Sequence, residues 1–100
     1  MRRAAKVDGT QAEIVKALRD AGCKVLSLAA CGNGVPDLLV KVNQTPYEMY
    51  DEMYLLEVKN PAGRGTKLTA AQVEFHKDWP VAVVTNAAEA LAAVGLEGQP

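Results

Sequence analysis

Two segments of this sequence that otherwise read as buried strands contain four charged side chains, of which Asp37, Glu57 and Lys59 could do chemistry together. Residues 35–42 are mainly apolar but contain Asp37, and residues 53–59 contain Glu57 and Lys59. Side chains alternate between the two faces of a strand, so Glu57 and Lys59 share one face and lie about 7 Å apart. A charged group in a core strand is costly unless it is paired or binds a cation. We therefore treat these three residues as candidates for one chemical site.

The pairing of the two segments decides whether the two carboxylates meet. If the segments pair antiparallel with Leu39 beside Leu55, Asp37 comes to lie beside Glu57. A register shifted by one residue would separate the carboxylates onto opposite faces of the sheet. Pro36 also allows Asp37 to be a turn residue, but the apolar run that follows it favours a place within the strand.

Two neighbouring carboxylates and a lysine suit metal-dependent hydrolysis of a phosphodiester. Carboxylates a few Å apart repel each other, which raises a pKa unless a cation lies between them. Mg²⁺ prefers one or two carboxylate oxygens together with water and substrate phosphate. It makes a bound water a better nucleophile and neutralises charge on the phosphoryl oxygens. Lys59 would orient that water or stabilise the pentavalent phosphorus, beside a metal held by Asp37 and Glu57.

The flanking sequence predicts the elements that position these residues. Asp8 or Thr10 can cap a first helix that runs to about Ala21, and Asn86 can cap the last helix. The complete order is α-β-β-β-α-β-α, which is an α/β fold with a mixed sheet of four strands flanked by helices. The expected helices span residues 10–21, 70–78 and 87–94, and the expected strands span residues 24–30, 35–42, 53–59 and 81–85.

Further predictions concern the helix at 70–78 and the strand at 81–85. The helix at 70–78 connects the last two strands, which should therefore lie parallel with a right-handed crossover. Its apolar spacing predicts that Ala71, Phe75 and Trp79 are buried. The strand at 81–85 begins with a wholly apolar run, which is typical of a strand inside a sheet.

Length and composition describe one ordinary globular domain over residues 1–100. Apolar residues make up 49% and charged residues 23% of the chain, and no apolar run is long enough for a membrane span. The basic N-terminus lacks the apolar core of a secretory signal, and the two cysteines read as free thiols, so we expect a cytoplasmic protein. The single histidine argues against a zinc site.

At these positions the sequence resembles the PD-(D/E)XK nuclease superfamily. Pro36-Asp37 corresponds to the PD, and Glu57-Val58-Lys59 corresponds to the (D/E)XK. The closer resemblance is to the virus-type replication-repair nuclease (VRR-NUC) domains, over residues 12–94. It adds a glutamate in the first helix, Glu13, and the segments 34–40 and 68–76, the second of which contains Gln72.

This resemblance implies a restriction-endonuclease-like fold and a structure-selective DNA endonuclease that needs Mg²⁺ or Mn²⁺. Minimal members resemble Holliday-junction resolvases, which implies a homodimer acting on branched DNA in a bacterium or a phage-infected host cell. The resemblance implies metal binding by Asp37, Glu57, the Val58 carbonyl and Glu13, with Lys59 as the catalytic lysine and Gln72 and Glu13 completing the active site.

The charge pattern bears on contact with DNA. A net charge of −1 and a pI near 5.8 argue against a protein that holds nucleic acid by bulk charge. Acidic residues cluster at 48–52, whereas Arg64 and Lys67 lie in a glycine-containing loop that can form a local basic rim. Arg64 and Lys67 are therefore the candidates for DNA-backbone contacts, and a solvated loop is the alternative.

Simpler interpretations remain open for several of these residues. Thr10-x-x-Glu13 and Thr69-x-x-Gln72 both fit the capping box, in which the third helical residue reaches back to the cap, and both roles can hold together. His76 fits a partly exposed surface histidine better than a general base. The alternative to a nuclease is a catalytically silent nucleic-acid- or protein-binding module with the same fold, or an interaction protein whose strand charges are solvated.

Overall fold

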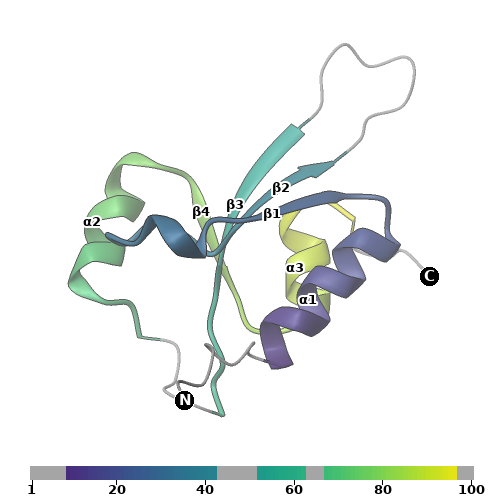
Figure 1. The fold of residues 1–100 in the computed structure, drawn as a ribbon, viewed down its shortest axis with the longest axis horizontal. Helices are drawn as coiled ribbons and strands as arrows, with labels where there is room; N and C mark the ends of the chain where they lie inside the picture. Colours follow the sequence, from purple (N-terminus) through teal and green to yellow (C-terminus); the bar gives the residue numbers. More distant parts are fainter. Residues whose placement is uncertain (1–8, 43–51, 63–66, 97–100) are drawn as a thin grey trace.

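A four-stranded sheet organises the described part of the chain (Figure 1). The computed structural model describes residues 9–42, 52–62 and 67–96. The elements are α1 (Gly9–Asp20), β1 (Lys24–Ser27), the 3₁₀ helix η1 (Ala29–Cys31), β2 (Leu38–Val42), β3 (Glu52–Val58), α2 (Ala70–Asp78), β4 (Val81–Val84) and α3 (Ala87–Ala93).

The strands lie in the order β1-β2-β3-β4. β1 and β2 pair antiparallel, β2 and β3 pair antiparallel, and β3 and β4 pair parallel. The α/β class, the mixed sheet and the parallel pairing of the last two strands are therefore confirmed. Among the helices of the described segments, none has the length and apolar composition that crossing a membrane requires.

One face of the sheet forms the hydrophobic core. α1 and α3 lie together on that face (Figure 1). The core side chains, all at most 2% exposed, are Ile14, Leu18, Leu38, Val40, Leu56, Val84, Ala90 and Val94. Burial of each large aliphatic side chain contributes about 1.5–3 kcal/mol to folding. Leu38 and Val40 of β2 point into the core, so Leu39 between them faces away from it.

β2 begins later than the sequence predicts. Its ladder starts at Leu38, and Asp37 lies in a bend immediately before it, so the prediction that Asp37 belongs to the strand was wrong by one residue. Pro36 has no N–H to donate, which delays regular pairing. Asp37 is nevertheless tied to the sheet edge, because its carbonyl accepts a hydrogen bond of 2.8 Å from the Leu28 N–H.

Two other predicted boundaries also move. β1 ends at Ser27, and η1 occupies residues that the sequence assigns to the strand. The Ser27 hydroxyl accepts a 3.3 Å hydrogen bond from the Ala29 N–H, a local bond that competes with strand pairing. α1 begins at Gly9, so Thr10 lies inside the helix and not at its cap, while Asp8 falls outside the described residues. The predicted cap Asn86 is confirmed, since its side chain accepts from the Glu89 N–H.

The prediction of a central β4 was wrong. β4 pairs only with β3 within the described sheet, and Val83 is 39% exposed. An apolar run alone does not distinguish a central strand from an edge strand. The prediction that α2 buries its apolar side was also wrong. Ala71 is exposed, Trp79 is 55% exposed, and only Phe75 is partly buried, with its ring stacked on Trp79 at 5.7 Å between centroids.

Candidate active site

The ladder between β2 and β3 brings Asp37 next to Glu57. Leu39 pairs with Leu55, which is the register that the sequence predicts, and the ladder ends at the pair Leu38 and Leu56. Asp37 and Glu57 are the next residues of the two segments, and their side chains are in contact. The strands part at this point. Asp37 Oδ2 accepts a hydrogen bond of 2.7 Å from the Val58 N–H, so a carboxylate side chain takes the place of a backbone partner. The two acidic groups therefore meet where β2 and β3 separate.

Glu57 is the buried acid of this pair. Only 3% of the residue is exposed, and its Oε1 has no hydrogen-bond partner among the described residues. The pKa of Glu57 is raised to about 7, first by burial and then by the charge of Asp37 and a hydrogen bond with it, while the charge of Lys59 opposes the shift. A bound cation would stabilise the ionised form of Glu57, because desolvation and the like charge of Asp37 both destabilise that form.

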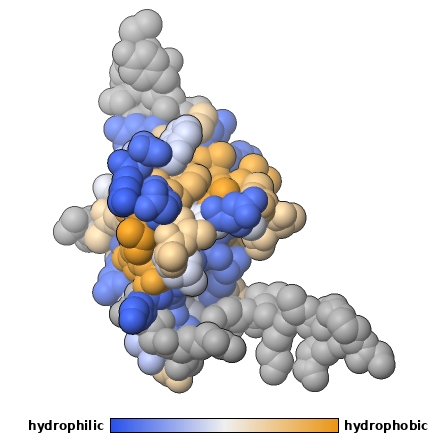
Figure 2. All heavy atoms as spheres, turned by 90° about the vertical axis from the view of Figure 1, so that its left-hand side faces the viewer, coloured by the Kyte–Doolittle hydropathy of each residue, from blue (hydrophilic) through white to orange (hydrophobic). Residues whose placement is uncertain are grey.

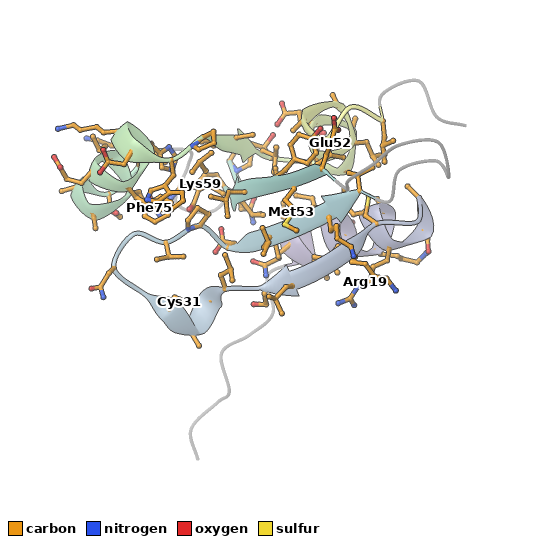
Figure 3. The ribbon with its side chains drawn as sticks, turned by 90° about the horizontal axis from the view of Figure 1, so that it is seen from above. Arg19, Cys31, Glu52, Met53, Lys59 and Phe75 are labelled. Carbon is orange, nitrogen blue, oxygen red and sulfur yellow. The ribbon has the colours of Figure 1, made fainter. Side chains whose placement is uncertain are left out.

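Lys59 and Gln72 complete the contacts around Glu57. Gln72 Nε2 donates to Glu57 Oε2 at 3.0 Å, and Lys59 Nζ donates to Gln72 Oε1 at 2.9 Å. Lys59 Nζ also lies 3.8 Å from Glu57 Oε2, and only 14% of the Lys59 side chain is exposed. Figure 3 shows Lys59 beside α2 and near Phe75, on the opposite side of the molecule from Arg19. The lysine is thus held over the carboxylate pair by an amide from α2.

Gln72 serves α2 and the charged cluster at the same time. Its Oε1 accepts from the Thr69 N–H at 2.9 Å, and its own N–H donates to Thr69 Oγ1 at 3.2 Å, which completes the predicted capping box. The same Oε1 accepts from Lys59. An amide can do both because its oxygen has two lone pairs and its nitrogen remains free to donate to Glu57. The start of α2 and the position of Lys59 are therefore coupled.

A close backbone contact sets the distance of α2 from the sheet, and the sequence interpretation missed it. Gly34 has φ +81°, and a Cβ at this position would lie 2.3 Å from the Ala71 carbonyl oxygen and 2.9 Å from the Gln72 nitrogen. Only glycine allows this approach and this φ at low cost. The turn signal in Gly32–Gly34 was visible in the sequence, but nothing local indicates that the turn touches α2.

Other predicted site residues lie apart from this cluster or outside the described residues. Glu13 is exposed on α1, and the structure does not bring it into the contacts of Asp37 and Glu57. Lys67 is exposed, and Arg64 lies outside the described residues. His76 follows Gln72 by one helical turn and is partly exposed, but its Nε2 is buried without a hydrogen-bond partner in the described segments.

The donor set fits a divalent cation that takes few protein ligands. The described residues contain no group of three or more His, Cys, Asp or Glu side chains placed to hold a metal. Mg²⁺ is nonetheless commonly bound by one or two carboxylates with water and substrate oxygens, which the Asp37–Glu57 pair supplies. The N–H and C=O of one strand residue point to the same neighbour, so the Val58 carbonyl also lies on the Asp37 side. The unpartnered Oε1 of Glu57 is the acceptor that such an ion would satisfy.

Comparison of the chain with models of protein families, with curated proteins and with solved structures gave no match.

Proposed function

We propose that this chain is a metal-dependent DNA endonuclease of the PD-(D/E)XK type, with a restriction-endonuclease-like arrangement of its sheet and helices. The observation that carries the proposal is the meeting of Asp37 and Glu57 where β2 and β3 separate, with Lys59 on the face of Glu57. Solvated strand charges would not produce this geometry, since Glu57 is 3% exposed. A buried acid beside a second acid is costly, and a cation would offset that cost.

Each residue of the cluster has a distinct task in this proposal. Asp37, Glu57 and the Val58 carbonyl would hold Mg²⁺ or Mn²⁺, which supplies an activated water and charge neutralisation when bound. Lys59 would stabilise the negative charge that grows on the phosphoryl oxygens, because its ammonium already lies 3.8 Å from Glu57. Gln72 would keep Lys59 in place through its 2.9 Å hydrogen bond. Glu13 remains a weaker candidate, because it is exposed on α1.

The substrate and assembly follow from the resemblance to VRR-NUC domains. Branched DNA, such as a Holliday junction, is the proposed substrate, and a homodimer would place two sites on two strands. Lys67 is exposed and would contact the DNA backbone, as would Arg64. With a net charge of −1, the chain would rely on such local contacts, so we expect cleavage to fall steeply with added salt.

The experiment is cleavage of a labelled four-way junction and of a linear duplex of equal length, with Mg²⁺, with Mn²⁺ and with a chelator. Lys59→Ala should lower the rate by about 100-fold or more, since it removes a cation from the transition state. Lys77→Ala is the matched control, because Lys77 is exposed on α2 and pairs with Glu74 at the helix surface. It should cleave at the rate of the unmodified protein.

The second candidate function is a catalytically silent binding module of the same fold. It would predict binding of the junction without cleavage under any metal condition. Equal cleavage of the junction and the duplex would keep the chemistry but remove the preference for branched DNA. Metal-independent cleavage, or equal activity of Lys59→Ala and Lys77→Ala, would contradict the proposed active site.

A further inference from the structure

An apolar groove crosses the sheet face that carries the candidate active site. It consists of two shallow hollows, of about 320 Å³ and about 360 Å³, which share Met53 of β3 in their linings. Met53 precedes Glu57 by four residues in the same strand, so both face away from the core. Trp79 lines the hollow on the β4 side, and Lys24 and Lys41 line the hollow on the β1 side. We call the two hollows together the sheet groove.

An exposed tryptophan forms one end of the sheet groove. Trp79 is the C-cap of α2 and is 55% exposed, and Phe75 is stacked on its ring with 18° between the ring planes. Met53 and Leu26, which are 63% and 58% exposed, continue the apolar surface along the groove. Figure 2 views the molecule from the α2 side and shows hydrophobic residues at the surface, bordered by hydrophilic ones. A contiguous group of exposed apolar side chains marks an interaction surface.

α2 connects this tryptophan to the candidate active site. Gln72 accepts the 2.9 Å hydrogen bond of Lys59, and Trp79 follows Gln72 by seven residues, which is about 10 Å along a helix axis. Figure 3 shows Phe75, the stacking partner of Trp79, near Lys59. Stacked nucleotides repeat about every 3.4 Å along a strand, so roughly three nucleotides would span from a phosphate at Lys59 to the indole. The sheet groove is therefore within reach of a DNA strand bound at the site.

The charges of this sheet face suit a polyanion. Among the residues that the structure describes on this face, the cations are Lys24, Lys41 and Lys59, and the acids are Asp37 and Glu57. A divalent ion bound by the two acids would balance their charge and leave that of the three lysines. Lys24 is exposed at the end of the groove away from Trp79, which favours a phosphate there. Asp78 precedes Trp79 and is exposed, so the indole end favours a base over a phosphate.

These features fit a single strand better than a duplex or an apolar peptide. A base stacks on an indole when it is unpaired, whereas a duplex offers base edges and phosphates. An apolar helix would fill the hollows but would desolvate the lysines without a partner for their charge. Three strand spacings of about 4.8 Å make the groove about 14 Å long. With the 10 Å along α2, a path of roughly 24 Å holds about seven stacked nucleotides, within the range of about 4–16 that single-strand sites cover.

We propose that the sheet groove binds an unpaired stretch of the substrate DNA strand, with one base stacked on Trp79 and a phosphate held by Lys24. The strand would pass from the metal site along α2 to Trp79 and then across the sheet. The inference rests on the proposed DNA endonuclease and adds that its substrate carries unpaired nucleotides about three positions from the cut. It concerns binding, so it is tested without cleavage.

The experiment uses Trp79 as its own reporter, because it is the single tryptophan of the chain. Its emission is followed while a single-stranded DNA oligonucleotide of mixed sequence and about 16 nucleotides is added in a chelator, which prevents metal-dependent cleavage. The single strand should quench the emission. Its blunt duplex with the complementary strand should quench much less, because its bases are paired and stacked on one another. Absence of quenching by the single strand, or equal quenching by the duplex, would overturn the proposal.

Anisotropy of the same strand with a fluorescent label tests the individual residues. Trp79→Ala should weaken binding about fivefold or more, and Trp79→Phe should keep most of the affinity, because a phenyl ring also stacks on a base. Val73→Ala is the matched control, because Val73 is 43% exposed on α2 and lies outside the lining of the groove. Lys24→Ala should weaken binding about twofold or more. Lys16→Ala makes the same change of net charge on α1, on the opposite side of the sheet, and should bind like the unmodified chain.

Equal weakening by Trp79→Ala and Val73→Ala, or by Lys24→Ala and Lys16→Ala, would overturn the sheet groove as the binding site. Circular dichroism should be the same for all these variants. Failure of this inference is distinguishable from failure of the proposed function. Metal-dependent cleavage without quenching would remove the groove and keep the nuclease, whereas quenching without cleavage in Mg²⁺ or Mn²⁺ would keep the groove and remove the nuclease.

Discussion

Gln72 and Glu57 are joined by a hydrogen bond of 3.0 Å from the Gln72 Nε2 to the Glu57 Oε2, although 15 residues separate them in the sequence. Through this bond the first turn of α2 is tied to the buried acid of β3. The amide oxygen of the same side chain holds Lys59. A capping residue of a helix thus also orders the charged groups that we assign to catalysis.

Gln72→Ala should lower both stability and activity. The loss of the capping box removes about 1 kcal/mol of stability, as for other helix caps. The rate of junction cleavage should fall further than this loss explains, because Lys59 loses the amide that positions it. Asn86→Ala is the matched control, since Asn86 caps α3 away from the cluster. Urea denaturation should show similar losses for the two variants, and equal effects on cleavage would contradict the role of Gln72.

Gly34→Ala should be more destabilising than an alanine at another glycine of positive φ. Gly22 has φ +96° and nothing within 4 Å of an added Cβ, so Gly22→Ala costs only the strain of its backbone, about 1–2 kcal/mol. Gly34→Ala adds an approach of 2.3 Å to the Ala71 carbonyl, which forces α2 away from the sheet. Urea denaturation of both variants measures the difference. Equal free energies of unfolding for Gly34→Ala and Gly22→Ala would show that the close approach of Gly34 to α2 does not affect stability.

Glu57 should make the metal-free protein less stable as the pH rises. Its pKa is raised from 4.5 to about 7 in the folded chain, so the folded state binds the proton more tightly than the unfolded state does. Stability is therefore highest below about pH 4.5, falls between about pH 4.5 and 7, and changes little from this group above that range. Partial solvation reduces the effect to on the order of 2 kcal/mol.

Glu57→Gln isolates this contribution, because an amide carries no charge at any of these pH values. In a chelator at pH 8 the variant should melt roughly 10 °C above the unmodified protein, and near pH 4.5 the two should melt together. The variant should also fail to cleave DNA. A melting temperature for Glu57→Gln that follows the unmodified protein at every pH would contradict a strained carboxylate pair.

The core of the cluster could be predicted from the sequence because local patterns determine it. The apolar positions Leu38, Val40 and Leu56 must face the same side, which leaves Asp37 and Glu57 on the other face. The capping pattern that contains Gln72 is also local, and the structure contains it. These features need only the period of a strand and the geometry of a helix end.

The features that the sequence did not predict depend on where distant segments meet. Val73 on α2 and Trp79 at its C-cap are both exposed, although the spacing of apolar residues in this segment predicts a buried side. The contacts of α2 with the carboxylate cluster are made by the polar Gln72. The edge position of β4 depends on what lies beyond it, which an apolar run does not record. The contact between Gly34 and Ala71 joins two segments that only the complete fold brings together.

Calorimetric titration of Mn²⁺ into the full chain at pH 8 is the most direct test of the account. Asp37→Asn removes one of the two carboxylates, and Glu74→Gln is the matched control, because Glu74 is exposed on the outer surface of α2. The account predicts binding to the unmodified chain and to Glu74→Gln, weakened about tenfold or more by Asp37→Asn. Binding that Asp37→Asn leaves unchanged, or no binding to the unmodified chain, would contradict a metal site at Asp37 and Glu57.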